Sequence, residues 1–177
     1  MEKKWTIRQT KRSDAQGIFI LLLMGWLDTY INDEIGVTRE FILDRRVNSL
    51  SYRFFKEECR YEYFENNDNN LHYIAEDEDG LIVGVIHGSK EEGVQELEGL
   101  YVYKELQGSG LAQELARKFI EWEDQGVISK VNVVEYNARA IKFYEKLGFK
   151  DSGGRNLFID KIPCIDMTKK NLVEGDK

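Results

Sequence analysis

The spacing of hydrophobic and polar residues at the start of the chain predicts one strand followed by helical segments. Residues 5–9 alternate enough to form a strand. Residues 15–30 are apolar around much of a helical circumference, and Ser13 or Asp14 can cap that helix. A second, irregular helical region is expected over 38–64, where the charged residues indicate a solvated face. We expect these helices to pack on a sheet built mostly from later residues.

The middle of the chain has the pattern of a three-stranded meander. Strands are expected over 71–75, 81–87 and 96–102, each of them rich in bulky apolar residues. Asp79-Gly80, between the first two strands, is a strong hairpin turn. Strands joined in this way pair antiparallel, so the meander predicts the centre of a largely antiparallel sheet.

Helical and strand periods then alternate. Apolar residues recur at helical spacing over 111–122, and the β-branched run 131–134 predicts a short buried strand. Asn137 can cap a second helix over 138–147, and Gly148 can terminate it. These alternating segments predict helices that cover the sheet formed by the meander.

The last third of the chain predicts a hairpin. We expect strands at 149–151 and 157–159 joined by a turn at 152–154, and a last strand over 162–168. Pro163 suggests that this last strand starts at a sheet edge. The order of elements predicts a mixed α/β fold with one mostly antiparallel sheet of about six to seven strands and helices on both faces.

The charge of the chain narrows its possible partners. Its 177 residues carry a formal net charge of −7. Acidity argues against a nucleic-acid binder and mildly favours a cationic partner such as an amine, although it also serves solubility. The length fits a single domain over 1–170 with a polar tail at 171–177.

Cysteine usage and hydropathy indicate the cellular compartment in which the protein works. Cys59 and Cys164 are far apart and lack the spacing of a zinc site, so we expect no metal and a reduced, cytoplasmic setting. The longest apolar run, residues 18–24, is too short to span a bilayer and follows no signal-peptide pattern. We therefore expect no membrane association.

A glycine-rich link joins the strand 96–102 to the helix 111–122. Gly108 and Gly110 let backbone N–H groups approach a ligand at the first helical turn, which suits a phosphate. No lysine follows either glycine as a triphosphate loop requires, and Gln113 stands where a dinucleotide fingerprint needs a small residue. Taken alone, this spacing could equally be a plain loop-to-helix turn.

Two motifs in register resemble the GNAT superfamily of acetyl-CoA-dependent N-acetyltransferases. The pyrophosphate loop of that family is similar to Gln107-Gly108-Ser109-Gly110-Leu111-Ala112. Its second signature is similar to Asn137, Ala140, Phe143, Tyr144, Gly148 and Phe149 at their spacing here. The resemblance covers residues 71–168 well and the first 70 residues only in outline. It implies the GNAT fold, acetyl-CoA as cofactor, and transfer of its acetyl group to an amine.

The resemblance also implies roles for individual residues. The N–H of Leu100 would polarise the thioester carbonyl, and Val102 would pair with the pantetheine arm where the strand from Val131 diverges. Tyr144 would be the general acid at the sulfur, although a core aromatic is the simpler explanation of its helical position. The residues expected to contact the cofactor are Leu100, Tyr101, Val102, Gln107, Gly108, Ser109, Gly110, Leu111, Ala112, Asn137, Phe143 and Tyr144, with Asn137 alternatively only a helix cap.

The base that deprotonates the amine is less well determined. Glu96 stands where some family members carry a catalytic glutamate, acting directly or through water. Glu96, Glu98 and Leu100 alternate along one strand, which predicts that they face the same way. His72 and His87 are candidates by residue type, although lone strand histidines are more often structural. A chain of waters without a single base stays open.

The first 70 residues are expected to select the acceptor. They resemble GNAT proteins near the bacterial polyamine acetyltransferases, which makes Trp26, Tyr30 and, from the later strand, Glu98 candidate contacts for a small amine or polyamine. The two aromatic residues could equally be helix packing. Acetylation of a protein N-terminus or lysine, and a non-catalytic acyl-CoA-binding module, stay open as alternatives. We expect a monomer or homodimer.

Overall fold

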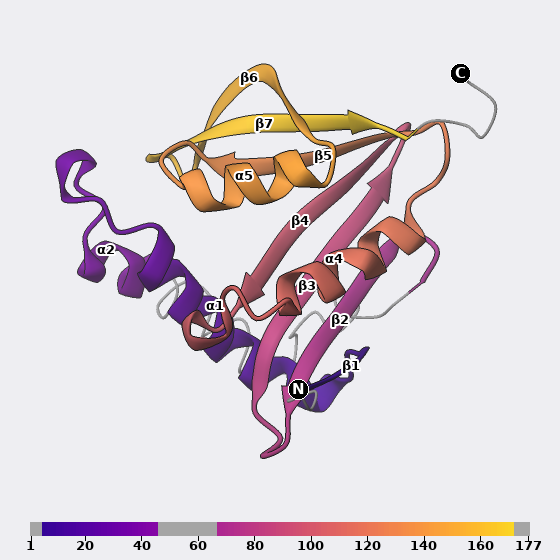
Figure 1. The fold of residues 1–177 in the computed structure, drawn as a ribbon. Helices are drawn as coiled ribbons and strands as arrows, with labels where there is room; N and C mark the ends of the chain where they lie inside the picture. The colour runs from indigo at the N-terminus through magenta and orange to yellow at the C-terminus, as the bar shows by residue number, and fades with distance from the viewer. Residues whose placement is uncertain (1–4, 46–66, 172–177) are drawn as a thin grey trace.

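The computed structural model describes residues 5–45 and 67–171, and their arrangement confirms the predicted mixed α/β fold (Figure 1). The described strands form a seven-stranded sheet with the order β1-β2-β3-β4-β5-β7-β6. Neighbouring strands pair antiparallel, except that β4 and β5 pair parallel. The predicted helical residues 46–64 lie outside the described residues. The elements are β1 (Trp5–Gln9), α1 (Ala15–Thr29), α2 (Arg39–Leu43), β2 (Asn70–Asp77), β3 (Ile82–Glu91), β4 (Val94–Val102), α4 (Leu111–Trp122), β5 (Ile128–Val134), α5 (Ala138–Lys146), β6 (Lys150–Phe158) and β7 (Ile162–Lys170).

Helices cover both faces of the sheet because successive strand residues point to opposite faces. On β3, Ile86 packs in the cluster that contains the buried α4 residue Leu115. Its neighbour Val85 packs with Ile18 and Leu21 of α1 in a separate cluster. The helix α1 runs unbroken through Gly25, where a side chain would collide with a ring packed below it. The sheet therefore has an α4 face and an α1 face.

Strands β4 and β5 are paired at one end only, which opens a wedge in the middle of the sheet. Their parallel pairing joins Val94–Leu97 to Ile128–Val131 and stops there. Beyond it, β4 keeps only β3 as a neighbour and β5 keeps only β7. Figure 1 shows the two strands separating, with the start of α4 beside the open end and α5 across β5. The predicted divergence of these strands is confirmed.

A buried polar cluster fixes the closed end of the wedge. Gln95, which is fully buried, donates from Nε2 to the Ser129 hydroxyl at 3.1 Å. That hydroxyl donates to Oε1 of Glu123 at 2.5 Å, and Lys169 Nζ lies 2.7 Å from Oε2 of the same carboxylate. Each polar side chain in the cluster has a hydrogen-bond or ion-pair partner within it. The cluster therefore joins β4, β5 and β7 without an unpaired buried charge.

The pairing of β3 with β4 contains a bulge at Glu98. His87 pairs with Gly99 and Gly88 pairs with Leu97, so Glu98 is one extra residue on β4. A bulge bends the strand and turns the local side chains relative to the regular alternation. It lies in the part of β4 that borders the wedge.

The final hairpin differs from the prediction. Residues 152–154 were expected to be its turn, but they form an irregularity within β6 between Asp151 and Arg155. Asp151 accepts hydrogen bonds from the Gly153 N–H at 2.8 Å and from Arg155, which stabilises this local loop inside one strand. The actual turn follows β6, where Ile159 and Asp160 have positive φ angles.

Pro163 does not mark a sheet edge, because β7 lies between β5 and β6. The last pair that joins β5 to β7 is Val134–Cys164, so Pro163 lies just beyond the end of β5. A proline lacks an N–H, and at this position no partner strand needs one from that side.

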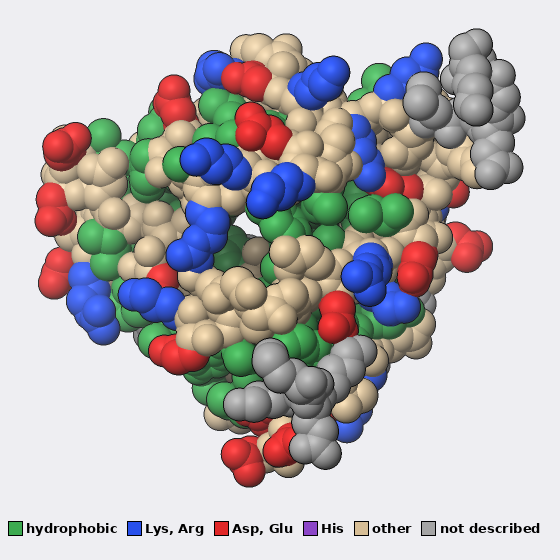
Figure 2. All heavy atoms as spheres, in the orientation of Figure 1, with side chains coloured by type: hydrophobic (Ala, Val, Ile, Leu, Met, Phe, Trp, Pro, Cys, Tyr) green, Lys and Arg blue, Asp and Glu red, His purple; other side chains and the backbone are tan. Residues whose placement is uncertain are grey.

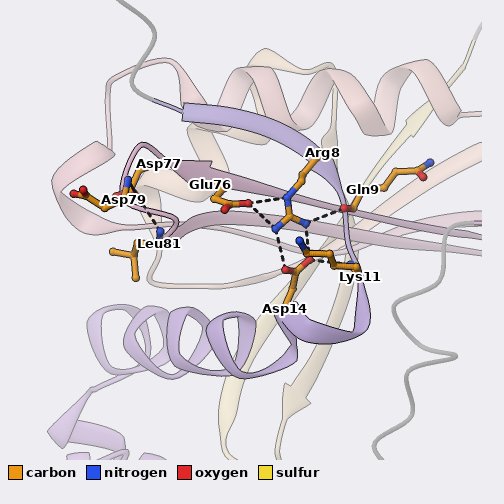
Figure 3. Close-up of polar contacts among 8 residues, drawn as sticks. All are labelled: Arg8, Gln9, Lys11, Asp14, Glu76, Asp77, Asp79 and Leu81. Atoms are coloured by element: carbon orange, nitrogen blue, oxygen red, sulfur yellow. Dashed lines mark hydrogen bonds and ion pairs between the residues drawn. The ribbon is translucent and has the colours of Figure 1, made fainter.

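Arg8 joins β1, β2 and the turn before α1 (Figure 3). Its Nη1 and Nη2 donate to the two oxygens of Asp14 at 2.6 and 2.9 Å, and its Nε donates to Glu76 at 2.7 Å. Asp14 also accepts from the Lys11 N–H at 2.8 Å. The carboxylate was expected to cap α1, but it makes no capping bond to that helix because these donors occupy it.

Asp14→Asn is expected to lower the free energy of unfolding by about 2 kcal/mol at neutral pH, the usual range for hydrogen bonds to charged groups. Burial opposes ionisation of Asp14, but the bonds from Arg8 and Lys11 outweigh it and hold its pKa below the ordinary value. A depressed carboxylate pKa stabilises the fold above the unfolded-state pKa of about 3.9, and this contribution disappears as the pH falls through the native pKa.

Urea unfolding at neutral and at acidic pH measures this effect. Asp79→Asn in the exposed β2–β3 turn is the matched control and should change stability by no more than about 0.5 kcal/mol. Equal stability of wild type and Asp14→Asn at neutral pH would contradict the structural role of the ion pair.

Candidate active site

The link between β4 and α4 has a backbone shape that only glycine adopts easily. Gly108 and Gly110 have φ angles of +86° and +98°. A Cβ added to either residue would meet no atom within 4 Å, so open space lies beside both. Glycine is therefore required here by backbone conformation, and the space beside it is accessible to a ligand.

Several backbone N–H groups of this link have no acceptor among the described residues: those of Gly108, Gly110, Ala112 and Gln113. The first intrahelical bond of α4 is Glu114 N–H to the Gly110 carbonyl at 3.1 Å. The Ser109 hydroxyl donates to the Leu106 carbonyl at 2.6 Å and thereby holds the link in place. Free N–H groups at the positive end of a helix dipole form an anion site.

The direction of the N–H groups at the end of β4 follows from one hydrogen bond just beyond the strand. Tyr103 donates its N–H to the Val83 carbonyl on β3 at 2.9 Å. N–H groups alternate between the two sides of a strand, so that of Tyr101 also points to β3. Those of Leu100 and Val102 consequently point into the wedge, where β5 has diverged. These two donors have no partner in the part of the chain that the structure describes, and they line the opening.

Tyr144 of α5 is buried, and its ring packs against Phe143 at 5.5 Å and Phe149 at 5.9 Å between centroids. Its hydroxyl has no hydrogen-bond partner among the described residues. Burial and the nearby Tyr101 raise the pKa of Tyr144 well above that of a free phenol. The hydroxyl therefore stays protonated at neutral pH and can donate a proton or a hydrogen bond.

Asn137 begins α5 in the way the sequence predicts. Its side-chain oxygen accepts the Ala140 N–H at 3.1 Å, which is an N-cap bond. The cap orients the helix that carries Phe143 and Tyr144. A contact between Asn137 and a cofactor stays a prediction.

The bulge separates residues that were expected to share a face. Glu98 accepts hydrogen bonds from Ser89 and from His87, whereas Leu100 packs with the core of the α4 face. The prediction that Glu96, Glu98 and Leu100 all point the same way is therefore wrong for Leu100. Simple alternation fails here because Glu98 is an extra residue in the strand.

The two carboxylates have different electrostatic surroundings. The hydrogen bond with His87 outweighs burial, and with that from Ser89 it lowers the pKa of Glu98 to about 2. Burial raises the pKa of Glu96, although Lys130 opposes this effect. Glu96 pairs with Lys130 across the closed end of the wedge. Four residues of strand, about 13 Å, separate Glu96 from Leu100, so a base at Glu96 would act through water.

Figure 2 shows the surface hollowed between α5 and the segment that leads into α4. Hydrophobic side chains lie at the bottom of the hollow, and lysine and arginine side chains lie around its rim. A basic rim above an apolar floor suits a ligand with an anionic end and an uncharged arm.

A model of the Acetyltransferase (GNAT) family matches residues 42–149, which is more than half of the chain. The chain belongs to the GNAT acetyltransferase family. It is accordingly an acetyltransferase that uses acetyl-CoA. A search of curated protein sequences found no significant match.

Solved structures with this GNAT fold span nearly the whole chain. The PaiA N-acetyltransferase from Thermoplasma acidophilum, solved in complex with coenzyme A, has a TM-score of 0.72 at 19% identity and covers 95% of this chain and 99% of its own. Ard1 from Thermoplasma volcanium has a TM-score of 0.63 at 18% identity, covering 97% and 100%. The ribosomal-protein-S18-alanine N-acetyltransferase from Escherichia coli has a TM-score of 0.60 at 15% identity, covering 98% and 97%. At these identities the likeness concerns the fold.

Aromatic side chains cluster on the α1 face of this GNAT protein, near the wedge. Trp26 and Tyr30 are 8% exposed, and both pack against Phe158. The hydroxyls of Tyr30 and Tyr101 lie 2.5 Å apart, and Tyr136 donates to the Tyr30 carbonyl at 2.7 Å. That Trp26 and Tyr30 contact the acceptor stays a prediction. Nothing in the sequence indicated that Phe158 and Tyr136 pack beside them, because no local pattern places β6 and the β5–α5 link against the end of α1.

Two negative findings concern the described residues alone. Across 5–45 and 67–171 no group of three histidine, cysteine, aspartate or glutamate side chains could hold a metal ion. In the same ranges no helix is long and apolar enough to cross a membrane.

Proposed function

We propose that this acetyltransferase transfers the acetyl group of acetyl-CoA to a primary amine by direct attack in a ternary complex, with a small amine or polyamine as acceptor. One observation carries the proposal. The wedge brings two inward-pointing β4 N–H groups close to an open anion cradle and a buried, protonated tyrosine. These are the donors that a phosphate, a thioester carbonyl and a departing thiolate need.

The residues present fit acetyl-CoA, which supplies the activated acetyl group. The free N–H groups between Gly108 and Ala112 hold the pyrophosphate. Val102 pairs with the amide-containing arm as an added strand would. The hydrophobic side chains at the bottom of the hollow exclude water from the reacting groups. The remaining proposed contacts come from the same link, the end of β4 and the start of α5, namely Tyr101, Gln107, Ser109, Leu111, Asn137 and Phe143.

Three residues act at the reacting bond. The Leu100 N–H stabilises negative charge that develops on the thioester oxygen. Tyr144 donates its proton to the departing sulfur, since its raised pKa keeps that proton in place. Glu96 can draw a proton from the amine only through water, because it lies too far along β4 for direct contact.

The α1 face supports a cationic acceptor. Glu96 and Glu98 point to this face, and Glu98 stays ionised at neutral pH. Trp26 and Tyr30 form an aromatic wall nearby, and Tyr30 offers its hydroxyl. An ammonium group is attracted both by carboxylates and by aromatic faces.

Two alternatives make different demands. Acetylation of a protein N-terminus or lysine needs room for a peptide backbone, and the E. coli enzyme named above acts on a ribosomal protein by its title. A non-catalytic acyl-CoA-binding module would not need a protonated tyrosine in the wedge. Tyr144 therefore favours an enzyme, and the acidic α1 face favours a small amine.

Thiol release from acetyl-CoA tests the proposal. Polyamines, amino acids and peptides are offered in turn, and each active amine is compared with its N,N-dimethyl analogue, which cannot form a stable amide. Release with a primary small amine and none with the analogue is the expected result. Release with peptides alone would move the acceptor to the protein class, and binding of acetyl-CoA without release would favour the module.

The remaining expectations concern the protein as a whole. We propose a single domain over 1–170, a cytoplasmic location, and a monomer or homodimer without nucleic-acid or membrane partners. These proposals rest on the charge, the cysteine usage and the spacing of elements in the sequence.

A further inference from the structure

His87 lies on β3 directly opposite Gly99, the residue that precedes Leu100. A Cβ added to Gly99 would collide with Nε2 of His87, so the imidazole lies against the Gly99 backbone. The His87 side chain is 25% exposed. This places an imidazole nitrogen over the face of β4 at Gly99, next to the Leu100 amide proposed to hold the thioester oxygen.

The other nitrogen of His87 has a fixed partner. Nδ1 lies 3.3 Å from Oε2 of Glu98, and the Ser89 hydroxyl donates to Oε1 of the same carboxylate at 2.6 Å. A carboxylate can only accept, so Nδ1 carries the proton in this contact and Nε2 of the neutral ring keeps a lone pair. The bulge at Glu98 is what turns this carboxylate toward His87.

We propose that His87 is the general base that deprotonates the acceptor amine, with Glu98 and Ser89 as the residues that position it. The assignment rests on the proposed amine acetylation and replaces the water-mediated role of Glu96 by direct contact. Glu96 lies at the closed end of the wedge, whereas His87 lies beside the residue that adjoins Leu100. Distance along the strand therefore favours the histidine.

The proton balance of the step is complete with the groups already named. Nε2 of His87 takes one proton from the ammonium, and the freed lone pair forms the C–N bond. The C–S bond breaks, and the sulfur takes the proton of the Tyr144 hydroxyl. The second nitrogen proton restores Tyr144. His87 then passes its proton to solvent, so one proton is released for each amide formed.

Among the described residues, the titratable and charged groups around His87 come from four strands. On β2, the ring of His72 stacks on that of His87, with 5.8 Å between the ring centroids. Burial and, to a smaller extent, the nearby His87 lower the pKa of His72 to about 4, so His72 is uncharged at neutral pH. On β4, Glu98 and Glu96 are the neighbouring carboxylates. Lys130 of β5 and Asp166 of β7, which lie 3.6 Å apart, are the charged groups near Glu96. Glu98 is therefore the carboxylate in direct contact with the His87 ring.

His87→Gln and Glu96→Gln are compared with wild type for kcat/KM of the amine across the pH range and for acetyl-CoA affinity by calorimetry. We expect His87→Gln to lower kcat/KM by about 10²–10⁴-fold without weakening acetyl-CoA binding. The acidic limb of the pH profile, which reflects loss of the neutral imidazole, should disappear in this variant and persist in Glu96→Gln. Added imidazole should restore part of the activity of His87→Ala.

An unchanged kcat/KM in His87→Gln would overturn the assignment, as would loss of the acidic limb in Glu96→Gln alone. Gly99→Ala gives a second test, because the new methyl group must displace the His87 ring. It should reproduce the loss of turnover with acetyl-CoA affinity retained. Failure of the proposed function is distinguishable, since the wild type itself would then release no thiol with any primary amine, and this would overturn both proposals.

Discussion

Gly110→Glu is expected to weaken acetyl-CoA binding by about 10³-fold. Gly110 lies at the start of α4 beside open space, among N–H groups that have no acceptor in the described chain. A carboxylate there would lie close to the pyrophosphate, and two like charges about 4 Å apart repel by about 4 kcal/mol at an effective dielectric constant of about 20. That energy corresponds to about 10³-fold in affinity.

Gly110→Gln is the control for this variant. Both substitutions place a side chain of the same shape on a backbone with φ of +98°, so both carry the same conformational strain. The difference between their dissociation constants in calorimetry reports the charge. Circular dichroism confirms that both variants are folded. Equal and tight binding by the two variants would contradict the location of the phosphate cradle.

Tyr144→Phe is expected to lower kcat by about 10²–10⁴-fold, the usual contribution of a general acid. The change removes one oxygen and leaves the ring contacts with Phe143 and Phe149 in place. The affinity for acetyl-CoA should change little, because the hydroxyl acts on the sulfur only as the C–S bond breaks. Steady-state kinetics and calorimetry together separate these two quantities.

Tyr73→Phe provides the matched control for Tyr144. Tyr73 lies on β2, away from the wedge, and its hydroxyl accepts from Gln9 at 3.4 Å. Removing this hydroxyl should leave kcat unchanged. If Tyr144→Phe behaved like Tyr73→Phe, the tyrosine would be a core residue without a chemical role.

The order of elements could be predicted because it depends on local patterns. Runs of bulky apolar residues and the Asp79-Gly80 turn defined the meander, and helical spacing defined α1 and α4 within a residue or two of their observed ends. Gly25 did not interrupt α1, since α1 packs so closely on Tyr101 at that point that no larger side chain fits. A packing requirement from a distant strand thus outweighed the low helical propensity of glycine.

The site could be predicted only where it is contiguous in sequence. The residues from Gln107 to Ala112 form one short link, so their spacing together with the family resemblance predicts an anion cradle. The pair of His87 and Glu98 depends on a strand register and on a bulge, and neither has a local signature. The expectation that Pro163 marks a sheet edge was wrong for the same reason, because the neighbours of a strand are set by the whole sheet.

The central claim is that acetyl-CoA binds in the wedge between β4 and β5. Amide chemical-shift changes on adding acetyl-CoA to ¹⁵N-labelled protein test it most directly. We predict the largest changes at the N–H groups of Leu100, Val102, Gly108, Gly110 and Ala112, with β1 and β6 little affected. Changes confined to the cavity lined by Gln9, Tyr73 and Trp122, on the side of α4 away from the wedge, would contradict the account.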